Sequence, residues 1–94
     1  MYVRLLTFSL GPGKQAVAQS VADDIAPRIE AMPGCRSVTV FGDHSDGQYG
    51  IFVLWDSEAD AKAAAPVIRP QVDERIAGHV QGKPEARLFQ VLSK

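Results

Sequence analysis

The sequence predicts one small α+β domain with the element order strand, helix, strand, strand, helix, strand. Two observations indicate this order. Segments rich in β-branched and aromatic residues flank two segments whose apolar residues recur at helical spacing. Clusters of glycine, proline and aspartate separate these segments. The 94 residues suit one domain core and leave little room for a second.

The first predicted helix follows the first predicted strand after a short turn. Residues 2–10 predict the strand, and Gly11-Pro12-Gly13 predicts the turn that ends it. The helix is amphipathic, with apolar residues four, four, four and three positions apart at Val17, Val21, Ile25, Ile29 and Met32. Pro27 has no backbone N–H to donate, so we expect a kink there. Residues 33–34, Pro-Gly, should end the helix.

The middle of the chain predicts a hairpin. Residues 35–41 alternate in character, with Val38 and Val40 on one face, and predict the second strand. Residues 48–55 predict the third strand. The loop 42–47 between them has a length and composition that suit an antiparallel connection.

The second predicted helix opens on a capping box and is rich in alanine. Ser57 and Asp60 have the spacing of that box, and the helix should run to about Ala77. Pro66 and Pro70 should bend the helix or split it in two. Gly78 is a C-terminal stop signal, and residues 86–92 predict the last strand.

Two β-α-β units joined in this way predict a ferredoxin-like, four-stranded antiparallel sheet with both helices on one face. The third strand, however, is apolar on both faces: Tyr49, Ile51, Val53 and Trp55 on one, Phe52 and Leu54 on the other. Helices can cover only one of these faces. We therefore expect the sheet of a second copy to cover the other face in a two-fold dimer.

Composition argues against several classes of partner and location. Ten Lys and Arg against eleven Asp and Glu give a net charge of −1, and no two basic residues are adjacent, so we expect neither nucleic acid nor a membrane as partner. No apolar run approaches the roughly 20 residues of a membrane span. The lone Cys35 cannot form an internal disulfide, and the first residues lack a signal-peptide pattern. We expect a cytoplasmic protein.

Four features that could suggest chemistry are interpreted as structural. The Gly-rich segment 11–14 lacks the spacing of a phosphate loop, and Gln15 stands where Ser or Thr is needed. Residues 43–46, Asp-His-Ser-Asp, contain one His between two carboxylates, which favours a hairpin turn over a metal site. His79 is interpreted as a helix-end residue rather than a base. Cys35 is interpreted as a packed thiol rather than a nucleophile.

The third strand also invites comparison with RNA-recognition domains, which share this topology. Their third strand carries two stacking aromatic residues on one face. Here Tyr49 and Phe52 are three residues apart and point to opposite faces, and Gln48 stands where a basic residue is expected. The pattern argues against RNA binding.

The chain resembles the antibiotic biosynthesis monooxygenase-like family of dimeric α+β barrels. The resemblance is carried by Gly13-Lys14, by residues 32–35 (Met-Pro-Gly-Cys) and above all by residues 55–61 (Trp-Asp-Ser-Glu-Ala-Asp-Ala). It implies that residues 1–94 form a single domain whose sheet pairs with that of a second subunit, and that each subunit keeps a pocket between sheet and helices. Some members of the family oxidise phenolic polyketides to quinones with dioxygen and without metal or flavin. Others degrade haem or share only the fold.

The haem-degrading branch uses an Asn on the first strand and a His on the second helix. The Asn position falls near Leu6, the chain contains no Asn, and the helix from Ser57 to Ala77 contains no His. The resemblance therefore argues against haem degradation.

The resemblance implies an apolar pocket near Trp55, although the same Trp at a strand end also suits a core position. The predicted pocket residues are Trp55, Tyr49, Leu6, Phe8 and Arg4. We expect no cofactor, and the catalytic residues are not predicted. Two functions stay open: a cofactor-independent monooxygenase-like enzyme that acts on an aromatic or phenolic molecule, and a non-catalytic dimeric module that binds a small apolar molecule or serves as a structural partner.

Overall fold

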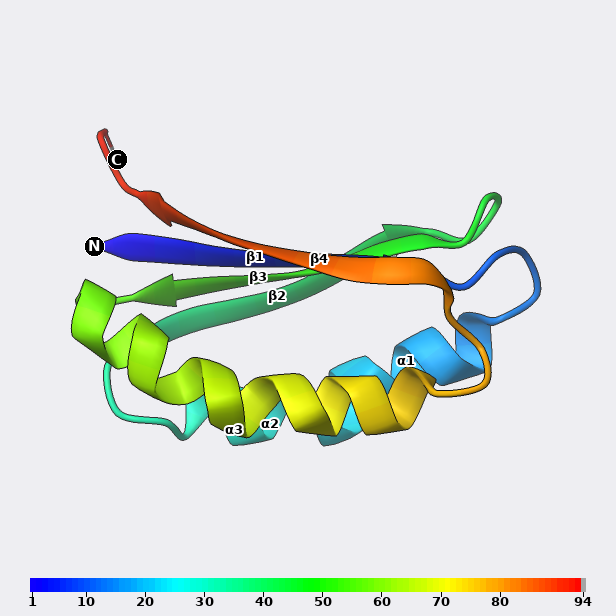
Figure 1. Cartoon of the computed structure of the whole chain (residues 1–94), viewed down its shortest axis with the longest axis horizontal. Helices are drawn as coiled ribbons and strands as arrows, with labels where there is room; N and C mark the ends of the chain where they lie inside the picture. Colours follow the sequence, from blue (N-terminus) through cyan, green and yellow to red (C-terminus); the bar gives the residue numbers. More distant parts are fainter. Residues whose placement is uncertain (94) are drawn as a thin grey trace.

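The computed structural model describes residues 1–93, and its element order confirms the predicted one. The four strands form one antiparallel sheet of spatial order β2-β3-β1-β4, and the helices all lie on one side of it (Figure 1). This is the predicted ferredoxin-like arrangement. The elements are β1 (Tyr2–Ser9), α1 (Gln15–Asp24), α2 (Ala26–Glu30), β2 (Cys35–Asp43), β3 (Gln48–Trp55), α3 (Glu58–Ile76) and β4 (Gln81–Gln90).

The last strand differs most from its predicted range of 86–92. It begins at Gln81 and ends at Gln90, because a segment that contains Gly82 and Pro84 pairs with the end of β1. Proline lacks the N–H that a central strand needs, but β4 is an edge strand and has a neighbour on one side only. Pro84 therefore did not end the strand, because an edge strand tolerates a residue without a backbone N–H. The strand β2 is also longer than predicted and ends at Asp43, which shortens the hairpin loop.

The first helical segment is broken where a kink was predicted. Helix α1 ends before Ile25, and Pro27 lies in the first turn of α2, where a missing backbone donor costs little. The backbone N–H of Ile25 still donates to the carbonyl of Val21 over 3.0 Å, so the two helices stay in contact end to end.

Helix α3 is bent and not split. Pro66 and Pro70 both lie inside it on exposed positions, and Figure 1 shows one continuous helix whose first turns slope toward the rest. The Oγ of Ser57 accepts a 3.1 Å hydrogen bond from the backbone N–H of Asp60, which confirms the predicted cap. After the helix, Gly78 takes a φ of +81°, as a glycine stop requires. Within residues 1–93 no helix is both long enough and apolar enough to cross a membrane.

The core lies between the sheet and the helices. Its buried side chains come from alternate positions of β1 and β3 and from the inner faces of the helices. The largest of those with almost no exposed surface are Trp55, Leu10, Ile25, Ile29, Ile51, Ile76, Val21 and Val72.

The opposite face of the sheet is apolar and carries no helix. Phe41, Phe52 and Phe89 are 45%, 37% and 38% exposed, whereas Tyr49, Ile51, Val53 and Trp55 on the other face of the hairpin are at most 4% exposed. The register places Leu5 opposite Phe52, and Val3 between Leu54 and Phe89. We call these six side chains the open-face patch: Val3, Leu5, Phe41, Phe52, Leu54 and Phe89.

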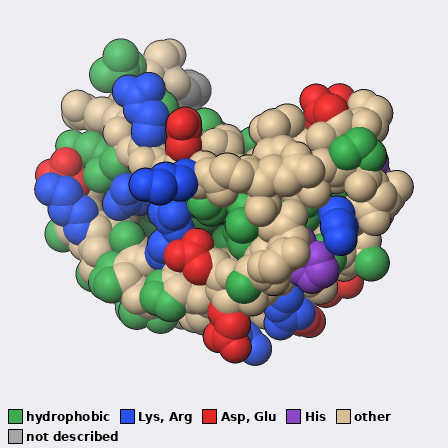
Figure 2. Space-filling model, turned by 45° about the vertical axis from the view of Figure 1, so that its right-hand side comes forward, with side chains coloured by type: hydrophobic (Ala, Val, Ile, Leu, Met, Phe, Trp, Pro, Cys, Tyr) green, Lys and Arg blue, Asp and Glu red, His purple; other side chains and the backbone are tan. Residues whose placement is uncertain are grey.

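The patch confirms the expectation that this sheet has two apolar faces. Figure 2 shows the upper side of the molecule hollowed between two raised ends, and Figure 1 identifies that side as the uncovered face of the sheet. Exposed apolar side chains gathered on one face are typical of an interaction surface.

Candidate functional site

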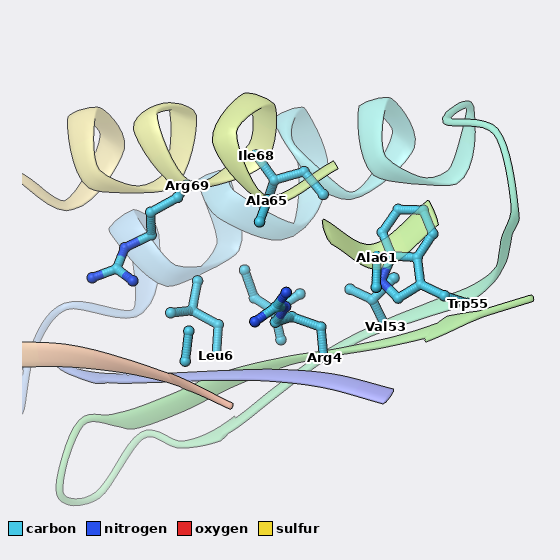
Figure 3. Close-up of a pocket in the computed structure, with 10 residues that line it drawn as sticks. Arg4, Leu6, Val53, Trp55, Ala61, Ala65, Ile68 and Arg69 are labelled. Carbon is cyan, nitrogen blue, oxygen red and sulfur yellow. The ribbon is translucent and has the colours of Figure 1, made fainter. Parts of the chain in front are cut away.

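A cavity of about 220 Å³ lies between the sheet and helix α3. Strands β1, β3 and β4 supply its floor and α3 its roof, and Figure 3 shows the side chains of both layers converging on it. Most of its wall is hydrocarbon. Its lining consists of Arg4, Leu6, Ile51, Val53, Trp55, Ala61, Ala65, Ile68, Arg69 and Ala86.

Two of the α3 residues that form the roof are alanines, and their small side chains leave space below the helix. Ala61, Ala65 and Ile68 recur at positions i, i+4 and i+7, which places them on one face of α3 above the sheet. Two methyl groups cannot fill the space that leucine or phenylalanine would fill in an ordinary core. The Ser57 cap fixes where α3 begins and therefore which of its residues face the sheet.

Trp55 closes one end of the cavity. It is the last residue of β3 and is only 1% exposed, so its ring is part of the wall and part of the core. The backbone just after it is held by a 2.8 Å hydrogen bond from the N–H of Asp56 to the carbonyl of Gly34. The indole Nε1 of Trp55 is buried and has no hydrogen-bond partner in the described chain. A buried N–H without an acceptor is uncommon, because it loses its hydration without compensation.

Two arginines enter the cavity from opposite walls. Arg4 rises from β1 and Arg69 descends from α3, so both guanidinium groups lie between the layers (Figure 3). Arg69 is satisfied: its Nε donates to Oδ1 of Asp73 at 2.9 Å and its Nη2 to the carbonyl of Pro84 at 3.4 Å. Arg4 is different, because its Nε is buried without a partner and no ion pair involves it within residues 1–93.

The lining contains no group that can take up a proton near neutral pH. Its polar side chains are two arginines and one tryptophan, whose N–H groups only donate hydrogen bonds. The cavity can therefore hold a ring and stabilise negative charge, but its own side chains offer no general base.

The sequence model of the family described as antibiotic biosynthesis monooxygenase matches residues 1–65, more than half of the chain. The chain belongs to this family. The matched region contains β1, the hairpin and the first turns of α3, and so includes Arg4, Trp55 and Ala61. No curated protein sequence matches the chain.

Solved structures of monooxygenase-named proteins share the fold. A Nitrosomonas europaea protein assigned to antibiotic biosynthesis monooxygenases superposes with a TM-score of 0.82 at 14% identity, over 99% of this chain and 100% of its own. One from Deinococcus radiodurans gives 0.82 at 17% identity, over 100% and 95%. A Streptomyces coelicolor monooxygenase, solved with the ligand nanaomycin D, gives 0.74 at 19% identity, over 99% and 88%.

In this family member, three of the five predicted pocket residues line the cavity: Trp55, Leu6 and Arg4. Phe8 and Tyr49 do not line it. Their rings stack on each other with centroids 6.1 Å apart, farther along the same face of the sheet. A Cβ added to Gly42 would lie 2.1 Å from the Tyr49 ring, so that ring packs on bare backbone of β2. The Tyr49 hydroxyl lies 2.7 Å from Nδ1 of His44, which directs it away from the cavity.

Sequence reasoning missed the roof and part of the floor. Ile51 and Val53 share a face with Trp55, and that alternation was a usable signal for the floor. The helical spacing of Ala61, Ala65 and Ile68 was a usable signal for the roof. No sequence signal identified Arg69 as a cavity residue, because it stands between two prolines that were expected to disrupt the helix.

The other motifs have structural roles. In the hairpin, Oδ1 of Asp43 accepts hydrogen bonds from the hydroxyl and backbone N–H of Ser45, which lower the pKa of Asp43. No group of three or more His, Cys, Asp or Glu in the described chain is placed to hold a metal ion. His79 follows α3 with its Nδ1 3.3 Å from Nζ of Lys14, and neither residue lines the cavity. Gly11 and Gly13 both have positive φ, as the predicted turn requires.

Cys35 lies at the start of β2, where it pairs with Trp55. Burial raises the pKa of the Cys35 thiol, and the nearby Glu30 carboxylate raises this pKa further. A raised pKa keeps the sulfur protonated at neutral pH, so this position does not activate a nucleophile.

The reactivity of Cys35 tests this interpretation. At pH 8 we expect iodoacetamide to modify the folded protein several-fold more slowly than the chain unfolded in urea, because less thiolate is present. Glu30→Gln removes the negative charge and should speed the reaction. Glu85→Gln, on the opposite edge strand β4, serves as the control and should not. A folded-state rate equal to the unfolded one would contradict the interpretation.

Proposed function

We propose that this protein is a cofactor-independent, monooxygenase-like protein that acts on or binds an aromatic or phenolic small molecule in the cavity beside Trp55. The observation that carries the proposal is the apolar cavity itself, with Trp55 across one end. Its volume of about 220 Å³ lies below the roughly 300–1,000 Å³ of pockets for drug-sized ligands, so it suits a molecule of one or two rings.

Family membership and the nanaomycin D bound to the Streptomyces coelicolor monooxygenase support this proposal. Arg4 places a guanidinium group in the cavity. When dioxygen oxidises a phenol to a quinone, one oxygen atom enters the ring and the other leaves as water. The reaction proceeds through the ionised phenol, and a guanidinium in the cavity favours that anion over the neutral form. The substrate would lose its proton to solvent, because the lining offers no base.

The missing base also favours a second function, a non-catalytic dimeric module that binds a small molecule or serves as a structural partner. Binding needs only the apolar lining and the arginines, both of which are present. Only the enzyme would convert its bound molecule to a product, whereas the binding module would release it unchanged.

Oxygen uptake distinguishes them. Metal-free protein should consume dioxygen on addition of some members of a panel of phenols and hydroquinones with one or two rings, beyond the rate of the substrate alone. The enzymatic rate should rise with pH as the phenol ionises. Ile68→Trp, which fills the cavity, should abolish the excess uptake, whereas Val67→Trp on the exposed face of α3 should preserve it. Absence of uptake across the whole panel would eliminate the enzyme and leave the binding module.

We also propose that the protein is a homodimer that pairs the open-face patches of two copies, and that it resides in the cytoplasm. The patch supports the dimer, because fully burying a large apolar side chain stabilises an assembly by about 1.5–3 kcal/mol. In a two-fold interface each such residue is buried once on each of the two copies. The cytoplasmic location rests on the single cysteine of the chain.

Charge placed in the patch should prevent the dimer from forming. Phe52 lies in the middle of the patch, paired with Leu5, so Phe52→Glu should shift the protein to a monomer in sedimentation velocity. Val67→Glu introduces the same charge at a residue of α3 that is 50% exposed, and should leave the dimer intact. If the unmodified protein sediments as a monomer at micromolar concentration, the proposed dimer is wrong.

A further inference from the structure

We propose that the cavity selects a small aromatic carboxylate, whose anionic group is held by the guanidinium of Arg4 and the indole N–H of Trp55. This inference rests on the proposed function, because it requires that the cavity bind a small molecule. It adds the chemical class of the ligand and the two side chains that recognise it.

The starting observation is that the only two buried side-chain polar atoms without a hydrogen-bond partner, among residues 1–93, line the same cavity. They are Nε of Arg4 and Nε1 of Trp55. Both are N–H donors and neither can accept a hydrogen bond. Two orphaned donors in one cavity indicate that an acceptor belongs between them, because leaving such groups unpaired away from water is costly.

The sheet register places these donors within reach of one group. Arg4 pairs with Val53 and Tyr2 pairs with Trp55, so Arg4 and Trp55 are diagonal neighbours on the same face of adjacent strands. Diagonal neighbours lie roughly 7–8 Å apart, a gap that a small acceptor can bridge between two long side chains. In Figure 3 the nitrogen of the Trp55 ring lies on the side that faces Arg4.

The charge balance of the cavity requires an anion. Asp73 neutralises Arg69, whereas no carboxylate pairs with Arg4 in the described chain and none lines the cavity. A partly buried guanidinium in an apolar wall is stabilised by a negative partner and gains little from a neutral one. A carboxylate fits best, because its two oxygens match the parallel N–H groups of a guanidinium.

The remaining lining defines the rest of the ligand. Beyond the two donors the walls are aliphatic, from Leu6, Val53 and Ala61 to Ile68, and offer no further hydrogen bonds. A flat apolar ring attached directly to the carboxylate would contact these walls while its acid group reaches Arg4. Neutral isosteres would occupy the same space and leave the Arg4 charge unpaired.

Matched acid and amide probes test the inference. We would titrate the protein calorimetrically with benzoate and benzamide, and again with 2-naphthoate and 2-naphthamide, at pH 7. Within a pair the acid should bind about tenfold more tightly or better, because one charged hydrogen-bonded pair replaces a neutral one. Arg4→Met should abolish that preference and still bind the amide, though more weakly because the neutral hydrogen bond is lost as well. The retained amide binding also shows that the variant is folded. Arg4→Lys should restore part of it.

A control removes the same charge elsewhere. Arg28→Met, at an exposed residue of α2 that bonds to Gln71, should keep the full preference for the acid. Equal binding of acid and amide, or a preference that survives in Arg4→Met, would overturn the carboxylate inference while the cavity remains a binding site. Failure of all four probes to bind would contradict the proposed function and this inference together.

Discussion

The alanine face of helix α3 is the constraint on which the site depends. Ala61 and Ala65 face the sheet where a core helix ordinarily presents larger residues, and the volume they leave is the cavity. The cavity is open to solvent on one side, and most of its wall is apolar, so water inside it finds few hydrogen-bond partners. The proposed binding role would account for this space beside Trp55, the largest buried residue.

The same geometry explains the orphaned donors. An alanine roof has no side-chain acceptor, so Trp55 and Arg4 find no partner in α3. The sheet then has two faces with different uses. One face meets α3 and forms the cavity, while the open-face patch provides the surface proposed for a second copy. Because successive residues of a strand point to opposite faces, Arg4 faces the cavity and Leu5 faces the open-face patch from adjacent positions.

Sequence patterns predicted the fold well because its signals are local. The capping box at Ser57 and the turn glycines each identified an element or its end. The start of β4 was not predictable in this way, because Pro84 is tolerated only at a sheet edge, and edge position is a tertiary property. The site was half predictable. The alternation of side chains along the strands places Trp55 and Arg4 on the helix-covered face. Only the packing shows that Tyr49, on the same face, packs its ring against Gly42 and directs its hydroxyl to His44 and not to the cavity.

The central claim, that the alanine roof leaves a ligand site against Trp55, is tested most directly by filling it. Trp55 is the only Trp, so its fluorescence reports this cavity alone. Quenching by 1,4-naphthoquinone, with matched absorbance controls, should be saturable in the unmodified protein and in Ala63→Leu, whose substitution lies on the exposed side of α3. Ala65→Leu should lose the saturable quenching and keep or raise the melting temperature, because leucine fills empty space. An Ala65→Leu protein that is quenched like the unmodified one, or that is destabilised by overpacking, would contradict the account.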